Sequence, residues 1–285
     1  MHPARSPVFE QQWPADARPR VSVLVTTYNQ ERWIGACLSG ILRQVTDFPL
    51  ELIVVDDAST DRTASIVRQY ADKYPHIVEP MLLTENLHSR GLTVRPELHR
   101  RARGEFIACC DGDDYWSDQH KLHKQVGFLA ANPRYVLSFH DAVHVDLEGK
   151  SLGRTELPAR ARRDYTQDEL RVLRWGWMLL GTMVHRNLPF EFPPEYRLIP
   201  NADNFIAMLL GGFGGAKFQG EVGPLAYRQH GEGIWSGRTP QERERMQLQS
   251  FLQIAAYFVR IGELDAARGI VSTRLAPRID RLMKP

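Results

Sequence analysis

Cysteine is scarce in this chain of 285 residues, which holds only Cys37, Cys109 and Cys110. Their positions do not match the spacing of metal-ligating cysteines, and two of them are neighbours on an expected strand. We therefore expect buried free thiols with a packing role, which fits a reducing compartment.

Long hydrophobic runs are also missing from the sequence. The longest apolar stretches fall far short of the ~20 residues that a membrane span needs. The first twenty residues carry proline and charge where a signal peptide has an apolar core. We expect a cytoplasmic protein with neither a membrane span nor a secretory leader.

The chain has little net charge, because 36 basic residues against 34 acidic ones leave a formal charge of +2. This balance gives no argument for nucleic acid as a partner, and the sequence shows no RNA- or DNA-binding motif. Repeats and low-complexity segments are absent too. A content of 43% hydrophobic and 25% charged residues is that of an ordinary globular protein, with one large domain or one domain with appendages.

The most informative stretch is acidic. Asp111, Gly112, Asp113 and Asp114 follow Cys109 and Cys110, which come directly after the apolar residues 106–108. A strand buried on both faces of a parallel sheet is apolar throughout, and ligands of such sheets bind beyond its carboxyl end. Carboxylates at that place suit Mg²⁺ or Mn²⁺ together with substrate phosphates. A surface turn that binds nothing is the alternative for an isolated Asp-Gly-Asp.

The upstream chain alternates between strand and helix patterns. Strands are expected at 21–27, 52–55, 77–83 and 106–110, and helices at about 31–45, 61–74 and 96–103. This alternation predicts parallel βαβ units and a doubly wound half.

The downstream chain is less regular. We expect a helix capped by Ser117 and Asp118, one strand over 135–145, and a long polar loop over 149–163. A capping box at Thr166 and Glu169 predicts a short helix through Trp175. The remaining expectations are a strand at 178–184, a helix at 205–210, an extended segment at 218–227, and a helix begun by Thr239 and Pro240.

Several short stretches, in a fixed order, belong to one pattern. They are Thr26-Thr27-Tyr28-Asn29, residues 54–61, residues 86–91 with 102–104, residues 110–116 with 121–126, and residues 227–237. Through them the chain resembles the family 2 glycosyltransferases of the GT-A fold over residues 21–237. The resemblance implies an α/β protein with a mostly parallel sheet flanked by helices. Residues 1–20 would be a flexible start, 21–116 the nucleotide-binding half, 117–237 the acceptor half, and 238–285 a helical extension.

The resemblance also implies roles for single residues on the nucleotide side. Thr26, Tyr28, Asn29 and Gly112 would contact the nucleotide. Asp57 would accept a hydrogen bond from a uracil-like base and Asp111 from the ribose, because ionised carboxylates are pure acceptors. Asp56 is either a further site residue or a brace of its loop. Arg90 is the arginine expected to bind phosphate, and Arg95, Arg100, Arg101 and Arg103 are expected to be solvated.

Other roles concern the cation and the sugar. Asp113, with Asp111 and His230, would hold the metal ion; a structural role is the alternative for His230. Asp114 would contact the sugar or the acceptor, and Trp235 would stack on a sugar face. Asp203 would be the general base, with a helix cap as its alternative. The family often carries an acidic pair at that place, whereas this chain has Asp203 alone in residues 201–204.

The implied reaction is metal-dependent transfer of one sugar, with inversion, from a nucleotide diphosphate sugar, with UDP donors favoured, to a glycan or lipid-linked acceptor. The Gln-x-x-Arg-Trp motif of processive members is absent. A sugar nucleotidyltransferase and a non-catalytic nucleotide-sugar binding module are the alternatives, although no glycine-rich phosphate loop follows the first strand.

The tail offers a separate hypothesis. Basic and apolar residues alternate there in a pattern typical of an amphipathic helix. Such a helix would lie on an anionic membrane at the inner face of the cell, or would pack on the catalytic domain.

Overall fold

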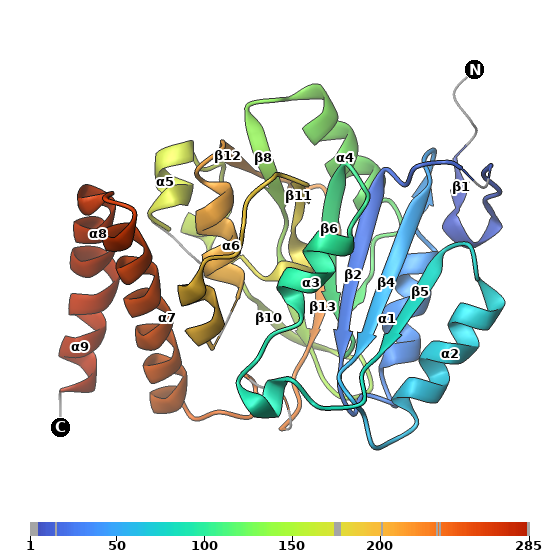
Figure 1. Ribbon diagram of the computed structural model, residues 1–285, viewed down its shortest axis with the longest axis horizontal. Coiled ribbons are helices and arrows are strands. Elements are labelled where there is room, and N and C mark those ends of the chain that lie inside the picture. Colours follow the sequence, from blue (N-terminus) through green and yellow to red (C-terminus); the bar gives the residue numbers. More distant parts are fainter. Residues whose placement is uncertain are drawn as a thin grey trace.

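A seven-stranded sheet with helices on both faces forms the centre of the molecule (Figure 1). The structure is a computed structural model that describes residues 5–14, 16–173, 178–200, 202–231, 233 and 235–283. The strands are β2 (Val21–Thr27), β4 (Leu50–Asp56), β5 (Val78–Leu82), β6 (Phe106–Asp111), β8 (Tyr135–Phe139), β11 (Val184–Arg186) and β12 (Gly215–Phe218). Their order is β12-β8-β11-β6-β2-β4-β5, and all neighbours are parallel except the pairs that involve β11.

The helices that follow the first strands are those the sequence predicts. They are α1 (Ile34–Leu42), α2 (Thr63–Lys73), α3 (Arg95–Arg101), α4 (Lys121–Ala131), α5 (Gln167–Arg171) and α6 (Asp203–Leu210). Two short strands, β1 (Ser6–Pro7) and β3 (Val45–Thr46), pair beside them. The predicted doubly wound half is therefore confirmed.

The side chains of alternate residues in the central strands pack into two separate hydrophobic cores. Val23 and Val25 of β2 belong to a core with side chains of α1, α2 and α4. Leu24, between them, belongs to a second core with side chains of α3 and α6 and of the C-terminal helices. Because both faces are covered, the strands are apolar throughout, as expected for a buried parallel sheet.

A second sheet of four strands corrects the prediction for the downstream half. Its strands are β7 (Tyr115–Trp116), β9 (Ala142–Val145), β10 (Ser151–Thr155) and β13 (Leu225–Arg228), in the order β10-β9-β13-β7. The single strand expected over 135–145 is wrong, since the chain leaves β8 in one sheet and continues as β9 in the other. Asp141 makes this break, because its Oδ1 accepts hydrogen bonds from the backbone N–H groups of Ala142 and Leu157.

The same exchange between sheets explains two further errors. The extended segment expected over 218–227 is divided between β12 and β13. The long loop expected over 149–163 contains β10, which pairs with β9. Strand β13 pairs with β7, which lies far upstream in the sequence, and no local pattern reveals such a partner, whereas β10 forms an antiparallel pair with β9, the strand directly before it.

Predictions of helix ends were correct where a capping box was present. Thr166 with Glu169 and Thr239 with Glu242 each form the reciprocal pair of bonds. The first of these helices ends at Arg171, earlier than expected, and the expected last residue, Trp175, lies outside the described residues. Helix α4 is not capped by Ser117 or Asp118 directly. The strand expected over 178–184 is wrong for most of its length, because Leu180–Thr182 forms a 3-10 turn and β11 begins at Val184.

The C-terminal extension packs on its own domain. It consists of α7 (Pro240–Arg260), α8 (Leu264–Ile270), a π-helical turn (Val271–Leu275) and α9 (Ala276–Leu282), at the end of the molecule opposite α2 (Figure 1). Its cations Arg274 and Arg278 are buried with their guanidinium groups over the ring of Phe251. Arg281 pairs with Glu244. The packing alternative is therefore the one that the structure favours over a membrane-bound face.

No helix in the described part of the chain is long and apolar enough to cross a membrane.

Candidate active site

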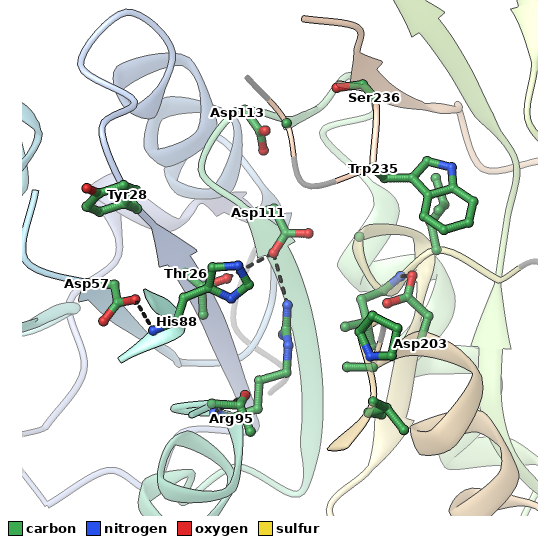
Figure 2. Close-up of a pocket in the computed structure, with 18 of the residues that line it drawn as sticks. Thr26, Tyr28, Asp57, His88, Arg95, Asp111, Asp113, Asp203, Trp235 and Ser236 are labelled. Carbon is green, nitrogen blue, oxygen red and sulfur yellow. Dashed lines mark hydrogen bonds and ion pairs between the residues drawn. The ribbon is translucent and has the colours of Figure 1, made fainter. Parts of the chain in front are cut away.

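A cleft of about 1190 Å³ opens beyond the carboxyl ends of β2, β4 and β6. Ten of the residues selected from the sequence line it: Thr26, Tyr28, Asn29, Asp57, Asp111, Asp113, Asp114, Asp203, His230 and Trp235. In Figure 2, Tyr28 and Asp57 lie on one side of Asp111, and Trp235 and Asp203 lie on the other. Residues from both halves of the chain therefore meet in one cavity.

Asp57 anchors one wall of the cleft. Its two carboxylate oxygens accept hydrogen bonds from the backbone N–H groups of Leu87 and His88, at 2.7 and 3.0 Å (Figure 2). Asn29, which has a positive φ of 50°, accepts a hydrogen bond from the N–H of Thr60. Since a carboxylate offers about four lone-pair sites, Asp57 keeps acceptor capacity for a ligand.

Asp111 is held at the centre of the cleft. Its Oδ1 accepts from the Thr26 hydroxyl at 2.9 Å and from Nη2 of Arg95 at 3.0 Å (Figure 2). The Arg95 side chain is only 12% exposed. Burial lowers the pKa of Arg95, but the neighbouring Asp111 and other acidic groups outweigh burial and raise it. A permanent positive charge therefore lies in the floor of the cleft beside Asp111.

Three selected residues do not line the cleft. Arg90 is exposed and pairs with Glu85 outside the cleft, whereas Arg95 is one of the arginines that line it. Asp56 is buried, and its carboxylate accepts hydrogen bonds from the N–H and the hydroxyl of Ser59. These bonds match the alternative in which Asp56 braces its loop. Gly112 permits close packing, since a Cβ there would lie 2.5 Å from Gln30 Oε1.

Asp113 and His230 form the pair best suited to a cation. Oδ2 of Asp113 lies 2.8 Å from Nε2 of His230, although the two residues are 117 positions apart. Adjacent ligands of an octahedral ion with bonds of about 2.1 Å lie about 3 Å apart, so this oxygen and nitrogen fit one divalent ion. Asp111 lies in the same cleft, with Oδ1 bonded to Thr26 and Arg95. No cluster of three or more such side chains exists in the described ranges, so water and phosphate would supply the other ligands.

Asp114 ties this acidic turn to the second sheet. It is buried, and its Oδ1 accepts from the backbone N–H of Arg228 at 2.9 Å. Burial, with Asp113 and Cys110 nearby, raises the pKa of Asp114 well above its usual value. Arg228 in turn donates to the carbonyl of Asp113. These bonds fix the acidic turn against β13, which leads to His230.

Asp203 begins α6 and is not its cap, since Ala202 holds the N-cap position. Its Oδ2 accepts from the backbone N–H of Leu180 at 3.2 Å. Burial, and then Asp111, raise the pKa of Asp203 to about 6. A carboxylate of that pKa is ionised at neutral pH yet takes up a proton readily, as a general base must.

The turn that holds Asp203 is itself supported from β7 and α4. The indole of Trp116 donates to the carbonyl of Gly181 at 2.9 Å, and the amide of Gln125 donates to the carbonyl of Thr182 at 3.1 Å. Lys121 donates to Gln125 Oε1 at 2.6 Å and lies over the Trp116 ring. All of these groups are buried, so Leu180 presents its N–H to Asp203 from a rigid support.

Comparison with known proteins identifies the family. The sequence profile described as Glycosyl transferase family 2 matches residues 22–184, more than half of the chain. The chain belongs to this family. The resemblance stated from its motifs is therefore confirmed.

Relatives of this family 2 chain include Rv1520 of Mycobacterium tuberculosis, an uncharacterized protein that is 33% identical over 230 residues. These residues are 79% of this chain and 63% of Rv1520. A shorter match is the poly(ribitol-phosphate) beta-N-acetylglucosaminyltransferase TarS of Staphylococcus aureus, at 39% identity over 99 residues, 34% of this chain and 16% of TarS. The chain thus spans less than two thirds of the length of these curated relatives.

Solved structures confirm the predicted GT-A type of α/β fold. TarS residues 1–349 in complex with UDP-GlcNAc superpose with a TM-score of 0.59 at 21% identity, covering 82% of this chain and 66% of that one. The mannosyltransferase PcManGT of Pyrobaculum calidifontis, in complex with GDP-Man and Mn²⁺, gives 0.57 at 21% identity and covers 96% and 82%.

Sequence reasoning missed some cleft residues of this family 2 chain. Arg95 was grouped with solvated arginines, although it lies three positions before the buried Leu98 on the face of α3 that meets the sheet. Glu156 and Tyr227 also line the cleft. Glu156 lies in the stretch that was expected to be a loop, and no local pattern could place it.

Proposed function

We propose that this chain transfers a single sugar from a nucleotide diphosphate donor, with UDP donors favoured, to a hydroxyl of a glycan or lipid-linked acceptor, with inversion. The observation that carries the proposal is one cleft in which Asp113 and His230 lie 2.8 Å apart and in which the half-buried Asp203 has a carboxylate of raised pKa. The solved structures of TarS with UDP-GlcNAc and of PcManGT with GDP-Man support a nucleotide-sugar donor.

In this proposal residues 21–116 bind the donor. Asp57 and Tyr28 lie where the base would enter, and Asp111, fixed by Thr26 and Arg95, would accept from the ribose hydroxyls. Asp113 and His230 would hold Mn²⁺ or Mg²⁺, which when bound neutralises charge that develops on the departing diphosphate. The donor sugar would then face residues 117–237.

The chemical step needs a base on the acceptor side. The acceptor oxygen forms a bond to the anomeric carbon as the bond from that carbon to the phosphate oxygen breaks, and the hydroxyl proton passes to Asp203. Attack opposite the leaving group inverts the anomeric centre. The bond from the Leu180 N–H fixes one oxygen of Asp203, so that the other is free for the acceptor.

The test is incubation of the protein with labelled UDP- and GDP-sugars, Mn²⁺ and a panel of glycan and lipid-linked acceptors. We expect release of nucleotide diphosphate with sugar on the acceptor, and slow sugar release to water without one. In a parallel incubation with added pyrophosphate, formation of nucleoside triphosphate and sugar 1-phosphate would assign a nucleotidyltransferase instead. Binding without any turnover would assign a non-catalytic module.

A further inference from the structure

Glu156 is a cleft carboxylate with a dedicated partner. It follows β10, its side chain is 19% exposed, and its Oε2 lies 2.9 Å from Nε2 of His144 on β9. The other ring nitrogen of His144, Nδ1, is buried and has no hydrogen-bond partner among the described residues. The imidazole is therefore committed to Glu156 and orients its carboxylate.

Tyr227 lies directly beside this pair. It is the register partner of His144 across the parallel strands β9 and β13, and the two rings meet edge to face with centroids 5.4 Å apart. Within the part of the chain that the structure describes, the Tyr227 hydroxyl and Glu156 Oε1 make no hydrogen bond, and neither atom is fully enclosed. Both residues line the cleft, so a donor and an acceptor are available there side by side.

The location within the cleft narrows the class of ligand. Tyr227 precedes Arg228, whose backbone N–H donates to Asp114 and whose guanidinium donates to the carbonyl of Asp113. Burial, and then the nearby Asp114, Glu156, Asp203 and Asp113, raise the pKa of the Tyr227 hydroxyl, so the phenol lies close to the acidic turn that carries Asp113. In a nucleotide sugar the hexose is attached directly to the second phosphate, so groups beside the diphosphate meet the sugar before any acceptor.

We propose that Glu156 and Tyr227, oriented by His144, form a subsite for the hydroxyl groups of the donor sugar and discriminate between sugar epimers. The inference rests on the proposed function. The carboxylate would accept a hydrogen bond from one sugar hydroxyl, and the phenol would donate one to the adjacent sugar hydroxyl. Both bonds form only when the two hydroxyls have the right relative orientation, which differs between epimers. Hydrogen bonds to a charged group are the stronger of the two kinds, so Glu156 carries more of the selectivity.

The test measures binding and not turnover. UDP-glucose, UDP-galactose, UDP-N-acetylglucosamine and GDP-mannose are titrated calorimetrically with Mn²⁺ into wild type, Glu156→Gln and Tyr227→Phe, each beside UDP or GDP alone. We expect Glu156→Gln to weaken the preferred sugar nucleotide by about tenfold or more and Tyr227→Phe by about threefold, with affinity for the free nucleotide diphosphate unchanged. The ratio of the Kd values for UDP-glucose and UDP-galactose should move closer to one in both variants.

Glu148→Gln is the matched control, because Glu148 is exposed and lies outside the cleft. Unchanged sugar-nucleotide affinity in Glu156→Gln and Tyr227→Phe, with a wild type that binds the donor, would overturn the subsite alone. So would an effect confined to the KM for the acceptor, which would assign these residues to the acceptor. A wild type that binds no sugar nucleotide would instead overturn the proposed function.

Discussion

The two halves of the cleft are built in different ways. On the nucleotide side, parallel strands end in loops whose carboxylates bond to other loops of the same βαβ layer, such as Asp57 to Leu87 thirty residues later. On the acceptor side, the contacts join helices, turns and loops that follow no repeating pattern, such as Gln125 to Thr182 and Lys124 to Glu221, which are 57 and 97 residues apart.

This difference explains what each half can do. A repeating βαβ pattern fixes a rigid platform from local sequence, which suits a ligand such as a nucleotide that many proteins share. The acceptor side depends on strands that pass from one sheet to the other and on polar groups buried between elements. The position of Asp203, the proposed base, therefore depends on the distant groups that support it.

The largest expected effect comes from Asp203→Asn. The amide oxygen can still accept from the Leu180 N–H, but the side chain cannot take a proton. We expect kcat to fall by about 10²-fold or more, with nucleotide diphosphate affinity retained. Steady-state kinetics and calorimetry check this, with the exposed Asp72→Asn as the control. Near-normal turnover would move the base to another group, with Asp114 next to be tested.

The pH dependence of the wild-type enzyme tests the same carboxylate without mutation. Burial and Asp111 raise the pKa of Asp203 to about 6, and the base acts only when ionised. We therefore expect kcat to fall about tenfold for each pH unit below about 6 and to be level above it. A rate profile between pH 4.5 and 8 checks this. An acidic limb near pH 4 would show that the essential base is an unperturbed carboxylate.

His230→Gln breaks the link between the halves at the cation pair. Loss of the imidazole nitrogen beside Asp113 should raise the Mn²⁺ concentration required for donor binding by about tenfold or more. Calorimetric titrations at fixed donor measure it, and the exposed His76→Gln serves as the control. The same metal requirement in His230→Gln as in wild type would remove His230 from the site.

Lys121→Met tests the buried support on the acceptor side. Burial lowers the pKa of Lys121 to about 7, whereas a lysine in an unfolded chain titrates near pH 10.4. Between these values the unfolded chain binds more protons, so Lys121 makes stability rise with pH. Relative to Lys121→Met, the wild-type free energy of unfolding should rise by up to about 1.4 kcal/mol per pH unit from pH 7 to 10. Urea unfolding at several pH values would contradict this if the difference stayed constant.

The smallest effect should come from Arg90→Ala. Arg90 forms an exposed ion pair with Glu85 outside the cleft, and such pairs contribute about 0 to 1 kcal/mol. We expect less than a twofold change in donor affinity, whereas Arg95→Ala should weaken it clearly because Arg95 fixes Asp111. Donor titrations of both variants check the contrast. Equal losses of donor affinity in Arg90→Ala and Arg95→Ala would show that Arg90 belongs to the site.

The sequence by itself determined the order of strands and helices in the nucleotide half. Strand β2 occupies the predicted residues 21–27, and the acidic turn follows β6 as expected, because apolar runs and their intervals are properties of neighbouring residues. The capping boxes of α5 and α7 were predictable for the same reason.

Only the tertiary structure decided the rest. Arg95 lines the cleft and bonds to Asp111, whereas Arg90 lies outside the cleft. Residues 135–145 are divided between two sheets. His230 lies beside Asp113, and Glu156 lines the cleft. The basic C-terminal helices pack on the domain, with the guanidinium groups of Arg274 and Arg278 over the ring of Phe251. Each of these outcomes depends on partners far along the chain, and the free energy of such contacts is set by burial and geometry that no local pattern encodes.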